Sequence, residues 1–246
     1  MKSFNKLRNY VSTAQCFSTS AIANLVLLAF VALLPMSLLA QGAHSKPEHI
    51  EWTWEVRPLH PDLALPNVLL IGDSITKNYF PQVANDLKGI ANVYLMASSI
   101  SVGDPRLTRE IAQFSTMEGV EFRAVHFNNG MHGWGYSEAQ FKASFPSYLR
   151  AVQHLVRTNR DLIWATITPV NPAAPNGATN ARVDARNAIA NHFVRAAGIS
   201  IDDQHALMVK HQDLHLDSVH FNSQGQALQG EQAAESIRNV LKSSSR

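Results

Sequence analysis

From Asn67 to near the C-terminus, short apolar runs alternate with longer stretches that repeat hydrophobic residues at helical spacing. Each apolar run is long enough for one buried strand, whereas the stretches between them are long enough for helices. The predicted strands are 67–71, 92–96, 122–127, 162–167 and 198–202. The predicted helices are 74–87, 105–114, 138–157, 181–197 and 223–242. Strands that alternate with helices predict an α/β fold of three layers, with a mostly parallel five-stranded sheet between two layers of helices.

The first 40 residues have a different pattern. Lys2, Lys6 and Arg8 occur there without any acidic residue, and they precede the almost wholly apolar stretch 21–40. A basic segment, an apolar segment and small residues before a polar stretch are the order found in secretory signal peptides. We therefore expect residues 1–40 to be a signal peptide and the protein to be secreted or periplasmic. The alternative is an uncleaved membrane anchor, because about 20 apolar residues can span a bilayer.

Composition narrows the function further. Hydrophobic residues make up 46% of the 246 residues and charged residues 16%, which is typical of a globular domain. The formal net charge is +2, and loss of the three basic residues of segment 1–40 leaves −1, so no nucleic-acid partner is expected. The single cysteine, Cys16, lies in the same segment. A mature chain would therefore have neither a disulfide nor a thiol nucleophile, and no cofactor is expected.

Two irregular stretches flank the predicted elements. Residues 41–66 mix charge, proline and aromatic residues, with Trp52 and Trp54 alternating in a short strand-like run. We interpret them as a leader that packs on the edge of a single domain, 67–246. The stretch 169–180 is rich in proline, asparagine, alanine and glycine, and it follows the fourth strand. It is either part of a substrate rim or lid, or a plain surface connection.

The sequence VLLIGDSITK places Ser74 where the first strand of the domain ends and a helix begins. In doubly wound sheets, ligands bind beyond the carboxyl ends of the strands. A serine hydroxyl becomes a nucleophile when a base takes its proton, and that base needs an orienting group. Near the C-terminus, LHLDSVHF offers Asp217 and His220 at a spacing that lets both sit on one turn. We predict Ser74 as nucleophile, His220 as general base and Asp217 as its orienter.

The blocks IGDSIT and DSVHF, in this order, resemble the SGNH (GDSL-type) hydrolases, a flavodoxin-like group of esterases, lipases and carbohydrate deacetylases. The resemblance covers about residues 64–242. It implies the same roles for Ser74, His220 and Asp217. It also implies that a glycine of the second block, Gly103 in ASSISVGDPRL, helps to bind the oxyanion through its backbone N–H, together with the N–H of Ser74.

The third block departs from the usual pattern of the family. Where Gly-x-Asn-Asp is expected, this chain has NNGMHGWG, which puts His132 at the position of the asparagine that donates to the oxyanion. The block is similar to that of a subgroup with Gly-x-His. His132 can donate from a ring nitrogen, or Asn128 or Asn129 can take the role, or His132 is an ordinary loop histidine.

A competing interpretation of the C-terminal block is a zinc site, formed by a cluster of histidine and aspartate side chains. The cluster consists of His211, Asp213, His215, Asp217 and His220. Its spacing fits no strong metal signature and leaves Ser74 unexplained, so no metal is expected. The pair Asp202 and Asp203 is interpreted as capping a following helix, not as catalytic carboxylates.

Together these features predict an exported serine esterase that hydrolyses short-chain, acetyl-type esters through an acyl-enzyme. Its partner would be a small-molecule or polysaccharide ester of a carbohydrate or cell wall, with membrane contact only if segment 1–40 is retained. One alternative is an O-acyltransferase with the same triad. Another is a non-catalytic carbohydrate-binding protein that stacks sugars on aromatic side chains, namely Trp52, Trp54, Trp134 and Tyr136. The sequence specifies neither the acyl group nor the oligomeric state.

Overall fold

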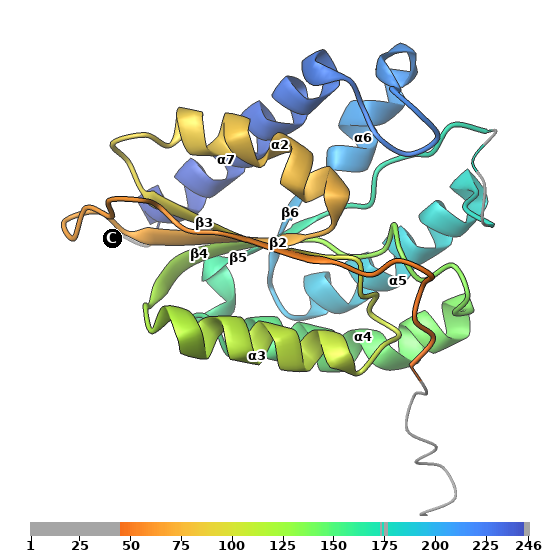
Figure 1. Ribbon diagram of the computed structural model, residues 1–246, viewed down its shortest axis with the longest axis horizontal. Helices are drawn as coiled ribbons and strands as arrows, with labels where there is room; N and C mark the ends of the chain where they lie inside the picture. Colours follow the sequence, from red (N-terminus) through yellow and green to blue (C-terminus); the bar gives the residue numbers. More distant parts are fainter. Residues whose placement is uncertain (1–44, 173, 175–176, 244–246) are drawn as a thin grey trace, which may run out of the picture. The chain divides into compact units, whose positions relative to one another are not determined.

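The computed structural model describes residues 45–172, 174 and 177–243, so the predicted signal segment lies outside the described residues. Its strands form one six-stranded sheet in the order β1-β3-β2-β4-β5-β6 (Figure 1). The strands are β1 (Thr53–Val56), β2 (Asn67–Gly72), β3 (Asn92–Ser98), β4 (Phe122–Phe127), β5 (Leu162–Ala165) and β6 (Ser200–Asp202). Strands β2 to β6 pair in parallel, which confirms the mostly parallel sheet.

The sheet has one strand more than the five predicted. The additional strand, β1, comes from the leader and pairs antiparallel with β3, from Thr53 opposite Ser98 to Val56 opposite Leu95. It is an edge strand of four residues. The strand-like run at Trp52 and Trp54 marks its position in the sequence, but so short an edge strand has too few buried positions to be counted as a strand of the predicted sheet.

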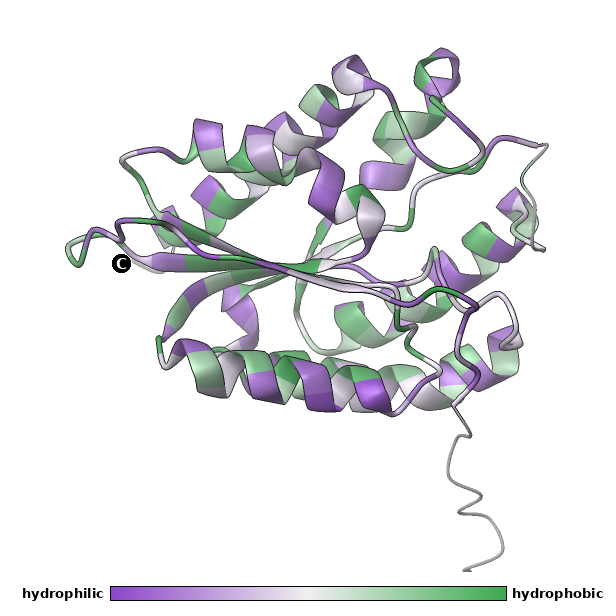
Figure 2. Cartoon of the chain, in the orientation of Figure 1, coloured by the Kyte–Doolittle hydropathy of each residue, from purple (hydrophilic) through white to green (hydrophobic). Residues whose placement is uncertain are grey.

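Helices cover both faces of the sheet, as predicted. In Figure 1, α2 and α7 lie on one face, and α3, α4 and α5 lie on the other. The helices are α2 (Ser74–Asp86), α3 (Arg106–Glu118), α4 (Glu138–Gln153), α5 (Asn180–Ala196), α6 (Gln204–Val209) and α7 (Ser223–Ser243). Short 3-10 turns, η2 (Asn159–Asp161) and η3 (Gln212–Leu214), complete the fold. Figure 2 shows hydrophilic and hydrophobic residues alternating along the helices, as expected of amphipathic helices with one face against the sheet.

The central strand β2 is buried on both sides. Val68 and Leu70 belong to the hydrophobic core beneath α2 and α7, whereas Leu69 and Ile71 belong to the core on the opposite face. This alternation follows from the period of two of a β-strand, and it explains why the sequence shows a continuous aliphatic run.

The position of β2 in the sheet determines where a site can form. Its neighbours are β3 and β4, the next two strands of the chain, so the chain passes from β2 to β3 on one side and then from β3 back to β4 on the other side of β2. In doubly wound sheets, this topological switch point opens a crevice outside the carboxyl end of the strand. The residues after Gly72 therefore lie at the expected binding edge.

No helix in the described part of the chain is both long and apolar enough to cross a bilayer.

Candidate active site

Ser74 is the first residue of α2 and directly follows the carboxyl end of β2. Asp73 caps the helix, since its Oδ1 accepts a hydrogen bond from the Ile75 N–H at 2.9 Å. A side chain at position 72 would place its Cβ 2.0 Å from the Thr76 Oγ1, so the close approach of Thr76 leaves room only for glycine where the strand passes into the helix. The tight turn leaves the Ser74 hydroxyl at the rim of the sheet.

The block DSVHF forms a compact turn before α7. Asp217 Oδ1 accepts hydrogen bonds from the backbone N–H groups of Val219 and His220, each at 2.8 Å. The Leu216 N–H donates to the His220 carbonyl at 2.8 Å and closes the turn. An aspartate that bonds the backbone two and three residues ahead is a common turn-forming arrangement. It holds the carboxylate and the imidazole in a fixed relation.

The three predicted catalytic residues lie in one relay. The Ser74 Oγ is 2.8 Å from His220 Nε2, and His220 Nδ1 is 2.8 Å from Asp217 Oδ2. A carboxylate can only accept, so the proton lies on Nδ1, and Nε2 is free to accept from the serine hydroxyl. Burial alone would raise the pKa of Asp217, but the hydrogen bonds from His220 and Val219 outweigh it and lower the pKa to about 2. Asp217 therefore stays ionised at neutral pH.

Ser74 and His220 line a cavity of about 530 Å³. The connection from β4 to α4, residues 128–137, is called the third-block loop, and it lines the cavity through Met131, His132, Trp134 and Gly135. The leader lines the cavity through Glu48, His49 and Ile50. Ala178, from the stretch predicted as a rim or lid, also lines the cavity; positions 173, 175 and 176 of that stretch lie outside the described residues. The nucleophile and base thus open onto a space large enough for a substrate.

Besides Ser74 itself, four residues were predicted to bind an oxyanion, and of these His132 is the one that lines the cavity. The Asn128 side chain donates to the Ala165 carbonyl at 2.7 Å. The Asn129 side chain ties the third block to the second, since it donates to the Ile100 carbonyl at 2.9 Å and accepts from the Val102 N–H at 3.0 Å.

Gly103 packs against the third-block loop, and a Cβ there would come within 2.6 Å of the Tyr136 ring. The contacts described for Asn128, Asn129 and Gly103 are contacts within the fold. Their role in binding an oxyanion stays a prediction.

His132 is held from two sides. Its Nδ1 lies 2.9 Å from Glu48 Oε2, and its ring meets Trp52 edge-on at a centroid distance of 5.9 Å. Its backbone carbonyl accepts a hydrogen bond from Arg186 Nη1 at 2.9 Å. His132 lines the same cavity as Ser74, and because Glu48 engages Nδ1, the ring nitrogen left for a ligand is Nε2.

Arg186, on α5, organises the third-block loop from beneath. Its guanidinium donates to backbone carbonyls of the loop at 2.8 to 3.3 Å, and its carbon Cζ lies 4.1 Å from the centroid of the Trp134 ring. The accepting carbonyls are those of Gly130, His132, Gly133 and Tyr136. The side chain is only 1% exposed, and burial lowers its pKa to about 10, so it remains a cation at neutral pH.

Sequence reasoning missed Glu48 and Arg186. Glu48 lies in a segment without a motif, and Arg186 lies within a helix whose pattern gives no sign that a charged residue is buried there. Only a tertiary contact to the third block identifies either residue. A weak signal existed in the length of the third-block loop, which needs many of its backbone carbonyls satisfied from elsewhere.

The competing interpretation of the C-terminal block was a zinc site, and within the described ranges no group of three or more histidine, cysteine, aspartate or glutamate side chains is placed to hold a metal ion. His215 instead stacks on Phe221 at a centroid distance of 4.3 Å. Asp203 caps α6, as predicted, by accepting from the Ala206 N–H at 3.1 Å. Asp202 does not cap that helix, because its carboxylate lies 2.8 Å from Nε2 of the buried His126.

The aromatic residues of the sugar-binding alternative lie in different surroundings. Trp54 is half-exposed, with the Lys77 ammonium 4.2 Å from its ring centroid, whereas Tyr136 is buried. One face of Trp134 is covered by Arg186. Trp134 nevertheless lines the cavity beside Ser74, so it is the aromatic side chain of this group that a ligand in the cavity can reach.

An α/β/α sheet with a serine, histidine and aspartate relay at its switch point defines a serine-hydrolase type of architecture. No sequence-family profile matches the chain, and no curated protein is significantly similar to it in sequence. Solved structures are similar in fold. A member of the lipolytic G-D-S-L family from Veillonella parvula is 16% identical with a TM-score of 0.58, and the match covers 70% of this chain and 98% of that one.

Two further structures give the same result. A GDSL-like lipase from Bacteroides thetaiotaomicron is 13% identical with a TM-score of 0.57, over 73% of this chain and 91% of that one. An acetylxylan esterase from Geobacillus stearothermophilus is 17% identical with a TM-score of 0.54, over 70% of this chain and 94% of that one. The fold of this protein is therefore that of the SGNH (GDSL-type) hydrolases, as the two sequence blocks predicted.

Proposed function

We propose that this protein is a serine esterase that removes short acyl groups, of the acetyl type, from a carbohydrate or cell-wall ester. The observation that carries the proposal is the relay of 2.8 Å contacts from Ser74 through His220 to Asp217. These residues come from opposite ends of the domain, and nothing in the packing of a fold requires them to meet in this order. Structures of the same fold include an acetylxylan esterase, which supports an acetyl ester as substrate.

The mechanism follows from the atoms of the relay. His220 Nε2 takes the proton of the Ser74 hydroxyl as Oγ attacks the ester carbonyl, and donors at the cavity wall stabilise the resulting oxyanion. His220 then gives this proton to the leaving alcohol, and the acyl group stays on Ser74. Water, deprotonated by His220, attacks the acyl-enzyme and releases the acid while the proton returns to Oγ.

Solvent access favours hydrolysis over transfer to a sugar hydroxyl. The side chains of His220 and Asp217 are 28% and 51% exposed, so water reaches the base from the open side of the cavity. A transferase has to exclude water from its acyl-enzyme to avoid losing the acyl group. Our proposal includes export, because residues 1–40 have the charge and hydropathy order of a signal peptide.

The test is turnover of p-nitrophenyl acetate and labelling by a fluorophosphonate probe, with Ser74→Ala as the matched variant. We expect the wild-type protein to be labelled and active, and the variant to lose both while its circular dichroism and melting temperature stay unchanged. Equal turnover in the two proteins would exclude Ser74 as nucleophile. An inactive, unlabelled but folded wild-type protein would instead favour the carbohydrate-binding alternative.

A further inference from the structure

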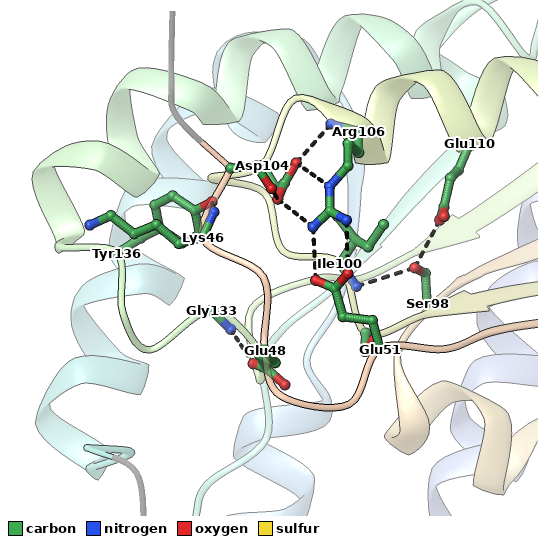
Figure 3. A network of polar contacts seen from close by, with 12 residues as sticks. Lys46, Glu48, Glu51, Ser98, Ile100, Asp104, Arg106, Glu110, Gly133 and Tyr136 are labelled. Atoms are coloured by element: carbon green, nitrogen blue, oxygen red, sulfur yellow. Dashed lines mark hydrogen bonds and ion pairs between the residues drawn. The ribbon is translucent and has the colours of Figure 1, made fainter.

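Glu48 belongs to the leader, yet both oxygens of its carboxylate are bound to the third-block loop. Oε2 lies 2.9 Å from His132 Nδ1, and Oε1 accepts a hydrogen bond from the Gly133 N–H at 2.9 Å. Figure 3 shows Glu48 facing Gly133 across the gap between the leader and the loop. Gly133 has a φ of 70°, a left-handed conformation that glycine adopts without strain. The loop is thus shaped to receive this carboxylate.

Contacts on either side of Glu48 hold the leader in place. The Lys46 backbone N–H donates to the Tyr136 hydroxyl at 2.6 Å. The Glu51 carboxylate takes two hydrogen bonds from Arg106, each at 2.8 Å (Figure 3). A bidentate carboxylate and guanidinium pair fixes orientation as well as distance. Because both flanks are anchored, Glu48 has little freedom to leave His132.

The charges around the His132 ring favour a cation. Burial alone would lower the pKa of His132, but the hydrogen bond to Glu48 and the negative charge of Asp73 outweigh it and raise that pKa above its ordinary value of 6.5. Burial likewise would raise the pKa of Glu48, and the hydrogen bonds from His132 and Gly133 lower it instead.

The elements packed around His132 carry few other charges that face it. The leader contributes Glu48, and the turn between β2 and α2 contributes Asp73. Helix α5 contributes Arg186, whose guanidinium donates to backbone carbonyls and lies 3.6 Å from Glu138 Oε1. The neutral rings and hydroxyls nearby are those of Trp52 and Ser74, and His220 lines the same cavity. The two carboxylates therefore set the protonation of the ring.

We propose that Glu48 is a positioning residue for catalysis, which holds His132 as an imidazolium so that its Nε2–H donates to the oxyanion formed at Ser74. This inference rests on the proposed esterase function. The ionised Glu48 carboxylate accepts a hydrogen bond from the Nδ1–H of the imidazolium, and the other N–H, on Nε2, is then available to the substrate. The third block thereby gains a charge-assisted donor where its relatives are expected to have a neutral amide, and charge-assisted hydrogen bonds are about twice as strong.

The proposal predicts that the rate falls at both the acidic and the alkaline end of the pH range. At low pH, protonation of His220 removes the base. At high pH, His132 loses the Nε2 proton and the oxyanion loses a donor, which lowers kcat by about 10²-fold to 10³-fold. A group whose pKa is raised keeps its proton to higher pH, so the alkaline loss of activity occurs above the range in which an ordinary histidine titrates.

The experiment measures kcat for p-nitrophenyl acetate from pH 5 to 10 on the full chain, with Glu48→Gln and the control Glu55→Gln. Both substitutions remove one leader carboxylate, but Glu55 pairs with Arg57 and contacts neither His132 nor the anchors of Glu48. We expect Glu48→Gln to move the alkaline limb to lower pH, because the imidazolium loses its ionised partner. Glu55→Gln should leave the position of that limb unchanged. A uniform loss in Glu48→Gln at every pH would overturn the proposal.

A second measurement separates this inference from the esterase proposal. Ring-proton NMR of His132 in the full-length Ser74→Ala protein, with and without Glu48→Gln, follows the imidazole without any turnover. We expect a titration above pH 6.5 that falls on substitution of Glu48. An unchanged titration, or a neutral ring at pH 6, would overturn the role of Glu48 even if the enzyme is active. If His132 titrates as expected but the wild-type protein has no turnover, the esterase proposal is contradicted and the effect of Glu48 on His132 is not.

Discussion

Replacing Arg186 with methionine tests how the third-block loop is held. Methionine keeps much of the side-chain volume but removes the guanidinium, whose hydrogen bonds to loop carbonyls run from 2.8 to 3.3 Å. The side chain is 1% exposed, so water does not replace the lost donors. The carbonyl of His132 is one of the groups left without its partner.

The expected cost follows from burial. Each hydrogen bond to a charged group contributes about 1.5–3 kcal/mol, but the desolvation of the guanidinium offsets a large part of that sum. Removing one partner from a buried charged arrangement typically costs about 3–5 kcal/mol, because polar groups stay buried and unpaired. For a domain of this size, that loss lowers the melting temperature by roughly 10 °C.

The assays are thermal unfolding followed by circular dichroism and kcat for p-nitrophenyl acetate at a temperature where both proteins are folded. We expect the loss of stability and also a fall in kcat of up to about 10²-fold, the effect of one misplaced oxyanion donor. The melting temperature reports the loss of fold stability, and kcat of the folded protein reports the loss of site geometry.

Arg182→Met is the matched control. Arg182 lies one turn earlier on α5 and also donates to the Tyr136 carbonyl, at 2.8 Å, but its side chain is 26% exposed. We expect this substitution to cost at most about 1 kcal/mol, since water can solvate the groups it leaves. If Arg186→Met were as stable as Arg182→Met, the view that buried carbonyls depend on Arg186 would be wrong.

Two further predictions concern Asp217 and Gly103. Asp217→Asn should lower kcat by about 10⁴-fold by favouring the wrong tautomer of His220. The pKa of Asp217 is lowered, so its stabilising effect is present above its ordinary pKa of 3.8 and is lost as pH falls through about 2. Melting temperatures of wild type and variant should therefore differ at pH 6 and converge near pH 2, and a constant gap would contradict this. Gly103→Ala should cost about 1–3 kcal/mol in urea unfolding, since its Cβ meets the Tyr136 ring at 2.6 Å. Gly135→Ala, whose nearest contact is 4.0 Å away, should be close to neutral, and equal losses would refute the steric argument.

Much of the fold follows from local pattern. The aliphatic run in β2 is readable because each of its residues is buried on one face or the other, and the same holds for β3 and, except at Arg123, for β4. The predicted helices were found because their apolar faces repeat at helical spacing. The short elements β1 and α6 were expected only without bounds, as a strand-like run at Trp52 and Trp54 and as a helix capped by Asp202 or Asp203, because four or six residues carry too little periodicity to set their ends.

The sequence by itself determined the order of strands and helices and the three residues of the relay. Ser74 is readable because it follows a buried strand, and Asp217 and His220 are readable because they share one short turn. Tertiary structure decided which residues complete the site. Glu48 and Arg186 meet His132 only after the leader and α5 pack around the third-block loop, and no local pattern records a contact between segments so far apart in the chain. Buried charges are placed by the partners that packing brings to them, and those partners appear only in the folded protein.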